Sequence, residues 1–246
     1  MWNYLTESVW NGVRLLAFAL IPGVLVGFLV QECSRFIQQG LRFCFGRTGF
    51  IYLTMPGVVI HELSHLFFCL IFQHKIVKVN LFSPQEDGTL GMIQHSYDSR
   101  NIFQRIGNFF IGSAPVWGGM LAMCLFSRLL LPDSLFSGDP VARLAEFCSI
   151  SLWHCWQSWL WLYLMLTIGS HISLSDADFH SVADGIGFLV LLLLVFCVLL
   201  GWVGNWEEKL IDAIRFLLWK LLIYGAIPIV FGGTIVCLCK IFFRKQ

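Results

Sequence analysis

Two histidines and a glutamate in this 246-residue chain stand at a spacing that supports metal chemistry, in the segment His61-Glu62-Leu63-Ser64-His65. Residues four apart share one face of a helix, so both imidazoles could bind the same zinc ion. Glu62 would project close enough to that ion to accept a proton from a water molecule beside it. Two ligands and one adjacent base therefore indicate metal-assisted hydrolysis.

The surroundings of this motif strengthen the interpretation. Glu62 is the only Asp, Glu, Lys or Arg between Phe50 and Phe72, an otherwise apolar run. A carboxylate is expensive to place in lipid and usually faces a polar cavity or a partner there. The alternatives are a polar cluster that holds helices together and an ion or proton path, but neither requires a base next to a histidine pair. Pro56 could start or kink the helix that presents the motif.

A catalytic zinc ion takes three protein ligands, so a third must come from elsewhere in the chain. The best source is the segment from His171 to His180, where Asp176 and Asp178 appear at the junction of two apolar runs. Asp176 beside Ser175 could instead cap the next helix. Both aspartates are candidates, and the histidines at the two ends of this segment come next. Three further histidines have no partner at ligand spacing and are interpreted as surface or packing residues: His74, His95 and His154.

The composition is that of a membrane protein, with 57% hydrophobic and 13% charged residues, against about 25% charged in soluble domains. The net charge of +1 gives no basic excess for binding nucleic acid. At about 20 residues per span, the chain has six runs long enough to cross or deeply enter a bilayer: Leu15–Val30, Phe50–Phe72, Ile106–Ser127, Phe147–Ser175, Gly185–Trp206 and Leu221–Cys239.

One polar insert after the second apolar run alternates as a β-strand does. From Lys75 to Leu81, alternate residues are apolar, and turn residues around Gly88 follow. The segment from Thr89 to Tyr97 can return as a second strand. The sequence therefore predicts a hairpin at the membrane surface. Its edge at Lys75 to Leu81 could pair with an unwound substrate segment.

The order of these elements resembles the site-2 protease family of membrane-embedded zinc metallopeptidases. The similar features, between about residues 50 and 200, are the HExxH helix, the hairpin, a Gly/Pro-rich membrane segment and a late aspartate: Ile60–Phe72, Lys75–Ile93, Gly112–Gly119 and Ser173–Phe179.

The resemblance implies one membrane-embedded metalloprotease domain over residues 1–246, with accessory membrane segments at 1–49 and 201–246. The expected fold is an all-α polytopic membrane protein with about six membrane segments and a small surface β-hairpin. His61, His65 and Asp178 would bind Zn²⁺, with Asp176 as the alternative third ligand, and Glu62 would be the general base. A multi-pass protein of this kind would act in the lipid bilayer on membrane protein or peptide substrates.

The chain departs from the family pattern in two places. The family's aspartate stands in Leu-Asp-Gly, whereas here Asp176 and Asp178 are both present and no glycine follows either. The family's Gly-rich segment commonly carries an Asn, and Gly112 to Gly119 has none. Ser113 is a candidate for orienting the scissile carbonyl, but close packing of helices is the favoured role of these small residues.

The expected activity is hydrolysis of peptide bonds in membrane protein substrates within or next to the bilayer. Two alternatives use the same residues differently. A non-catalytic member of the same fold would hold zinc and bind a membrane partner without cutting it. A transporter would pass metal ions or protons through the polar cluster.

Overall fold

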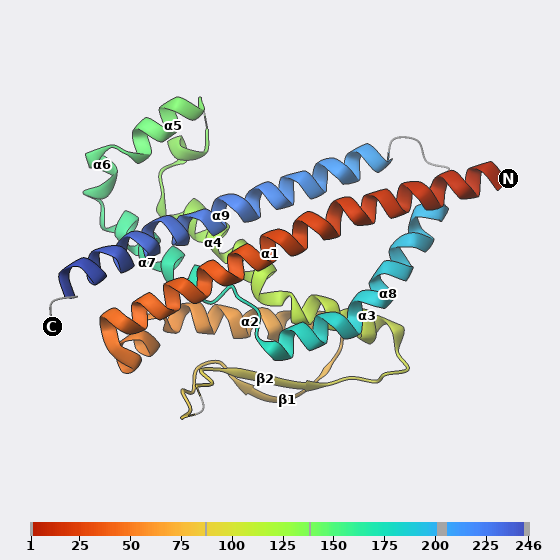
Figure 1. Ribbon diagram of the computed structural model, residues 1–246, viewed down its shortest axis with the longest axis horizontal. Coiled ribbons are helices and arrows are strands. Elements are labelled where there is room, and N and C mark those ends of the chain that lie inside the picture. The colour runs from red at the N-terminus through yellow and green to blue at the C-terminus, as the bar shows by residue number, and fades with distance from the viewer. Residues whose placement is uncertain (1, 87, 138, 201–205, 244–246) are drawn as a thin grey trace.

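The computed structural model describes residues 2–86, 88–137, 139–200 and 206–243 of the chain. The fold is mostly helical with one two-stranded antiparallel sheet (Figure 1). Its elements in chain order are α1 Trp2–Leu53, α2 Met55–Ile71, β1 Lys75–Asn80, β2 Met92–Ser96, α3 Ile102–Gly112, α4 Ala114–Leu130, η1 Asp133–Phe136, α5 Pro140–Phe147, α6 Ile150–Trp153, α7 Trp156–Ser170, α8 Asp176–Leu200 and α9 Trp206–Phe243.

The long helix α1 runs along most of the molecule and then turns back into α2 (Figure 1). Its helical geometry is interrupted at Gly46, where φ is 68° and ψ is 175°. A second break follows at Thr54, and Pro56 lies in the first turn of α2. Proline is tolerated there because the first amides of a helix have no partner within it. Pro56 therefore starts the helix that carries the HExxH segment.

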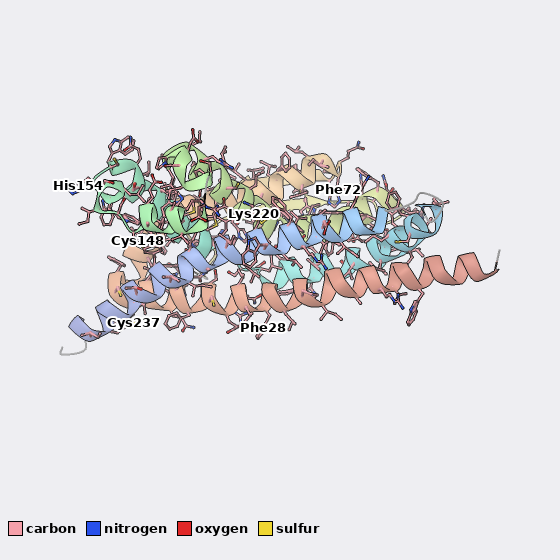
Figure 2. All side chains as sticks on the ribbon, turned by 90° about the horizontal axis from the view of Figure 1, so that it is seen from above. Phe28, Phe72, Cys148, His154, Lys220 and Cys237 are labelled. Carbon is pink, nitrogen blue, oxygen red and sulfur yellow. The ribbon has the colours of Figure 1, made fainter. Side chains whose placement is uncertain are left out.

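Helix α2 packs against α4 and α7. Helix α3 packs along α8, and α9 packs along α1. The main apolar core lies where α4 and α7 meet and includes Met123, Trp161, Met165 and Ile168. Apolar side chains such as Phe28 on α1 point outward from the bundle (Figure 2), as on a helix surface that contacts lipid.

Two described helical stretches, Asp176–Cys197 and Lys209–Thr234, are long and apolar enough to cross a membrane. Two bent helix pairs raise that number to four if each pair is one span. The part of the chain that the structure describes therefore holds fewer candidate spans than the six predicted. One reason is that α3 and α4 meet at a bend of 58°. Another is that α7 has only 15 residues, short of the roughly 20 that a span needs.

The predicted hairpin is confirmed as an antiparallel pair of strands. Val79 of β1 lies opposite Ile93 of β2. The return strand begins at Met92 instead of the predicted Thr89, and residues just before it contact helices as well. Leu90 packs against α1, and Gly91 lies against the side chain of Glu62 on α2.

Candidate metal centre

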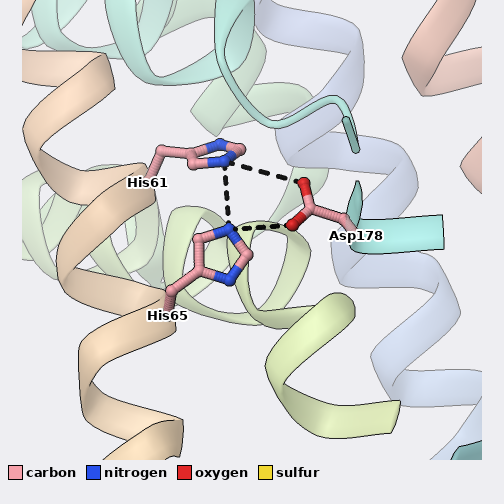
Figure 3. A group of neighbouring side chains, drawn as sticks. All are labelled: His61, His65 and Asp178. Atoms are coloured by element: carbon pink, nitrogen blue, oxygen red, sulfur yellow. Dashed lines mark hydrogen bonds and ion pairs between the residues drawn. The ribbon is translucent and has the colours of Figure 1, made fainter. Parts of the chain in front are cut away.

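Three predicted site residues converge between α2 and α8. The Nε2 atoms of His61 and His65 are 3.1 Å apart. One carboxylate oxygen of Asp178 lies 3.2 Å from His65 Nε2, and the other lies 3.9 Å from His61 Nε2 (Figure 3). His65 and Asp178 are buried, and His61 is half-buried. Helical spacing on α2 accounts for the two imidazoles, and the start of α8 brings in the carboxylate.

Backbone carbonyls fix how the two imidazoles are oriented. His61 Nδ1 is 2.7 Å from the carbonyl oxygen of His171, and His65 Nδ1 is 2.8 Å from that of Ile111. A carbonyl oxygen can only accept a hydrogen bond, so each Nδ1 carries the hydrogen in these contacts. In the neutral imidazoles both Nε2 atoms then present lone pairs toward Asp178. This hydrogen bonding of the second ring nitrogen is typical of histidines that bind metal ions.

The donor set fits a divalent cation. Tetrahedral ligands at 2.0–2.1 Å from zinc lie about 3.3 Å from one another, close to two of the three separations among these atoms. A proton on one nitrogen can bridge only two of the three donors at a time, whereas one cation can be bound by all three. Two imidazole nitrogens and a carboxylate oxygen are ligands that zinc accepts.

Ser175 and Asp178 form a cap at the beginning of α8. The backbone N–H and the hydroxyl of Ser175 donate to one carboxylate oxygen of Asp178, each over 2.7 Å. The N–H of Asp178 donates back to the Ser175 hydroxyl over 3.2 Å. This is the reciprocal pattern of a capping box, which leaves the other carboxylate oxygen facing His65. The cap expected from the sequence involved Asp176 beside Ser175, whereas the structure pairs Ser175 with Asp178, an arrangement that the Ser-x-x-Asp spacing could have indicated.

The alternative ligands lie outside this group of three. Asp176 is exposed at the first residue of α8, and His180 is exposed further along that helix. His171 contributes its carbonyl oxygen to His61, while its own Nε2 is buried without a hydrogen-bond partner. Burial, followed by the charges of His61 and Arg42, lowers the pKa of His171 to about 3. The ring of His171 is therefore neutral.

Glu62 is buried next to the hairpin and lines the same cavity as the three candidate ligands. The backbone of Ile93 on β2 forms a hydrogen bond with its carboxylate. Gly91 approaches so closely that a Cβ atom there would lie 2.6 Å from Glu62 Cγ. The hairpin therefore covers Glu62 and determines where its carboxylate lies.

The cavity around these groups has a volume of about 490 Å³. Its walls are residues 88–93 with His95 on the hairpin side, and residues 173–175, Ala177 and Asp178 on the other. Helix α1 also contributes Gln38 and Arg42. Sequence reasoning missed these two because α1 lies in the predicted accessory segment. The sequence feature that could have indicated them is that they are two polar residues four apart in the chain.

The remaining histidines lie outside the group of three, but two of them, His74 and His95, contact each other, and His95 also lines the cavity. His74 is buried, and its Nε2–H donates to the carbonyl oxygen of Gln104 over 2.9 Å. His95 Nδ1 therefore donates to His74 Nδ1 over 3.0 Å. This pair joins the hairpin to α3, and burial lowers the pKa of both imidazoles. His154 is exposed at the outer end of the bundle (Figure 2).

The Gly/Pro-rich segment packs helices together. Ser113 donates its hydroxyl to the carbonyl oxygen of Phe109 and accepts from the indole N–H of Trp117. It does not line the cavity, so its hydroxyl is not placed to orient a substrate carbonyl. Gly118 lies directly against Ser64 of α2. The expectation of close packing is confirmed.

Gly112 controls the position of Asp178 because α3 and α8 touch there through their backbones. A Cβ atom at Gly112 would lie 2.7 Å from the backbone nitrogen of Val182 and still closer to the backbone oxygen of Asp178. Gly112→Ala should therefore separate the helices and weaken zinc binding about tenfold or more, as for other changes that misplace a ligand. Chelator competition on the purified protein measures this.

The matched control for that substitution is Gly187→Ala on α8, where an added Cβ would meet no atom within 4 Å. It should bind zinc as the unmodified chain does. Equal zinc affinities for the two variants would show that the contact at Gly112 does not position Asp178.

Comparison of the chain with protein-family models, curated proteins and solved structures gives no match.

Proposed function

We propose that this chain is a membrane-embedded zinc metalloprotease similar to site-2 proteases, which hydrolyses peptide bonds of membrane protein substrates within or next to the bilayer. The observation that carries the proposal is the convergence of His61, His65 and Asp178 in one cavity with Glu62. Two oriented imidazoles and a capped carboxylate supply three ligands, and Glu62 supplies a base that is not one of them.

The zinc ion is proposed from the donor set of His61, His65 and Asp178. Bound there, it would supply Lewis-acid chemistry by polarising a peptide carbonyl and lowering the pKa of water toward neutral. His61 is the half-buried member of the group and lines the cavity, so a substrate can approach it from there.

Glu62 acts as the general base in this proposal. Its carboxylate accepts the proton of the attacking water molecule, and the resulting carboxylic acid donates that proton to the leaving amine. The contacts with Gly91 and Ile93 hold the side chain in place from the hairpin side. A fixed carboxylate needs little rearrangement between the two proton transfers.

A substrate helix has to unwind locally before its carbonyl can reach the site, because a helix uses its own backbone groups for hydrogen bonding. The hairpin edge next to the cavity belongs to β2, with Gly91, Ile93 and His95 among the lining residues. The edge expected from the sequence, Lys75 to Leu81, does not line it. We therefore assign pairing with an unwound substrate to β2 instead of β1.

Gly91→Ala tests whether the hairpin positions Glu62. The added methyl group would collide with the Glu62 side chain and with the carbonyl oxygen of Leu81, so the carboxylate has to move. A misplacement of about 1 Å can lower a rate about a hundredfold, and zinc should remain bound. Turnover and zinc content are measured on the same preparation. Gly27→Ala on α1, with no atom within 4 Å of the added Cβ, is the control. Unchanged turnover would contradict the role of the hairpin.

The function itself is tested with the purified chain in detergent micelles and in vesicles. Hydrolysis of peptides that requires both zinc and Glu62 would support a protease. Zinc-dependent retention of a membrane partner without cleavage would favour a binding protein, and metal flux across vesicles would favour a transporter. Mass spectrometry of a mixture of synthetic transmembrane peptides detects cleavage without knowledge of the natural substrate.

A further inference from the structure

Helix α1 brings a positive charge to the cavity that hydrolysis alone does not require. Gln38 and Arg42 are four residues apart on this helix and both line the cavity. The Gln38 amide donates to the carbonyl oxygen of Ser170 over 2.5 Å, which ties α1 to the end of α7. The wall that carries Arg42 is thereby joined to the segment whose next residue, His171, orients His61.

The guanidinium of Arg42 is supported by an aromatic ring. Its central carbon lies 4.7 Å from the centre of the Phe50 ring. Phe50 is buried in a cluster with Ile37 and Leu41, so the ring is a fixed platform. Stacking of this kind orients a guanidinium and leaves the N–H groups at its edge free to bind a planar anion.

The charge of Arg42 is not balanced within the cavity. Among the residues that the structure describes, Arg42 forms no ion pair, and the only acidic residues lining the cavity are Glu62 and Asp178. One divalent cation would balance these two carboxylates. The positive charge of Arg42 then remains, on an exposed side chain that lines the cavity and can meet an anion there.

Arg42 lies at one end of the β2 edge. Leu90, just before β2, packs against the same cluster of Ile37, Leu41 and Phe50 over which Arg42 is stacked. His95 is further along the strand and pairs with His74 instead. A substrate that adds antiparallel to β2 would therefore place its C-terminal part toward Leu90 and Arg42.

We propose that Arg42 binds a carboxylate of the substrate on the C-terminal side of the cleaved bond and so makes the chain selective for acidic peptides. The carboxylate is either an Asp or Glu side chain or the free C-terminus of the peptide, because the guanidinium recognises both through the same pair of hydrogen bonds. This inference rests on the proposed function, since it concerns the substrate of the same site.

The test measures binding to the full chain carrying Glu62→Gln, so that cleavage does not remove the probe. The probes are four mixtures of synthetic peptides with randomised flanks in detergent micelles. Each mixture has either Glu or Gln at the positions that are not randomised. Each also ends in either a free C-terminal carboxylate or a C-terminal amide, which gives the four combinations. We expect at least one carboxylate to tighten binding about twofold to fivefold, the range for an ion pair at an exposed side chain. If replacement of Glu by Gln weakens binding, the recognised carboxylate is a side chain. If amidation weakens binding, it is the C-terminus.

Addition of Arg42→Gln should abolish this preference, and Arg42→Lys should restore part of it. Arg35→Gln is the matched control, because Arg35 is exposed on the same helix as Arg42 but does not line the cavity and is paired with Glu32 at 2.7 Å; it should keep the preference. Equal binding of all mixtures, absence of binding, or a preference that survives Arg42→Gln would overturn the proposal. Failure of the proposed function is a separate result, since it would be seen as no zinc-dependent cleavage by the chain with Glu62 intact.

Discussion

Glu62→Gln is expected to lower peptide hydrolysis about a thousandfold while the protein keeps its zinc, since general acid–base catalysis contributes about 10²–10⁴. The substitution keeps the size of the side chain, so the contacts with Gly91 and Ile93 can persist. It removes only the ability to accept and return a proton. The three ligand atoms come from other residues, which is why metal content should not change.

The measurement for Glu62→Gln is turnover of a cleaved peptide together with the zinc content of the same sample. Glu32→Gln is the control, because Glu32 is exposed on α1 and paired with Arg35. Retention of full activity by the Glu62 variant would mean that another group serves as the base. Loss of zinc in that variant would mean that Glu62 is part of the metal site.

Asp178→Ala is expected to weaken zinc binding at least about a hundredfold, because it removes one of three ligands. Changing a residue that only supports a ligand already weakens metal binding about 10–100-fold. Asp176→Ala should bind zinc normally, since Asp176 is exposed at the start of α8 and lies outside the group of ligand atoms. Because these two aspartates are two residues apart on α8, comparison of the two variants separates the loss of a zinc ligand from a general effect on the helix.

Asp178 also accepts hydrogen bonds from Ser175, and loss of that cap costs about 1 kcal/mol of stability. Asp178→Asn controls for this effect, because its side-chain oxygen can still accept from Ser175 while its charge is gone. Metal analysis with chelator competition should rank the unmodified chain and Asp176→Ala together, above both Asp178 variants. The opposite ranking of Asp176 and Asp178 would assign the third ligand to Asp176.

The local part of the site followed from the sequence, and the rest required tertiary structure. His61 and His65 face one way because four residues make about one helical turn. Asp178 depends on how α8 packs against α3 at Gly112. The sequence offered it only as one of two aspartates in the segment from His171 to His180, and the resemblance favoured it over Asp176. Arg42 was missed because α1 lies in the predicted accessory segment, and only the turn from α1 into α2 brings the cavity next to it.

Apolar run length was a poor guide to the number of spans. The run from Ile106 to Ser127 is divided at Ser113, where α3 ends and Pro115 lies in the first turn of α4. The run from Phe147 to Ser175 is divided as well, and its longest helix is α7. Hydropathy counts apolar residues but does not detect such bends. In contrast, strand alternation and turn residues were sufficient for the hairpin, although not for which of its edges meets the cavity.

The most direct measurement is peptide hydrolysis while zinc is returned stepwise to chelator-treated protein. The account predicts no turnover without zinc, a rise in proportion to zinc bound, and a plateau at one ion per chain for the single group of His61, His65 and Asp178 found among the described residues. Hydrolysis by zinc-free protein, or an activity that does not follow zinc occupancy, would contradict it.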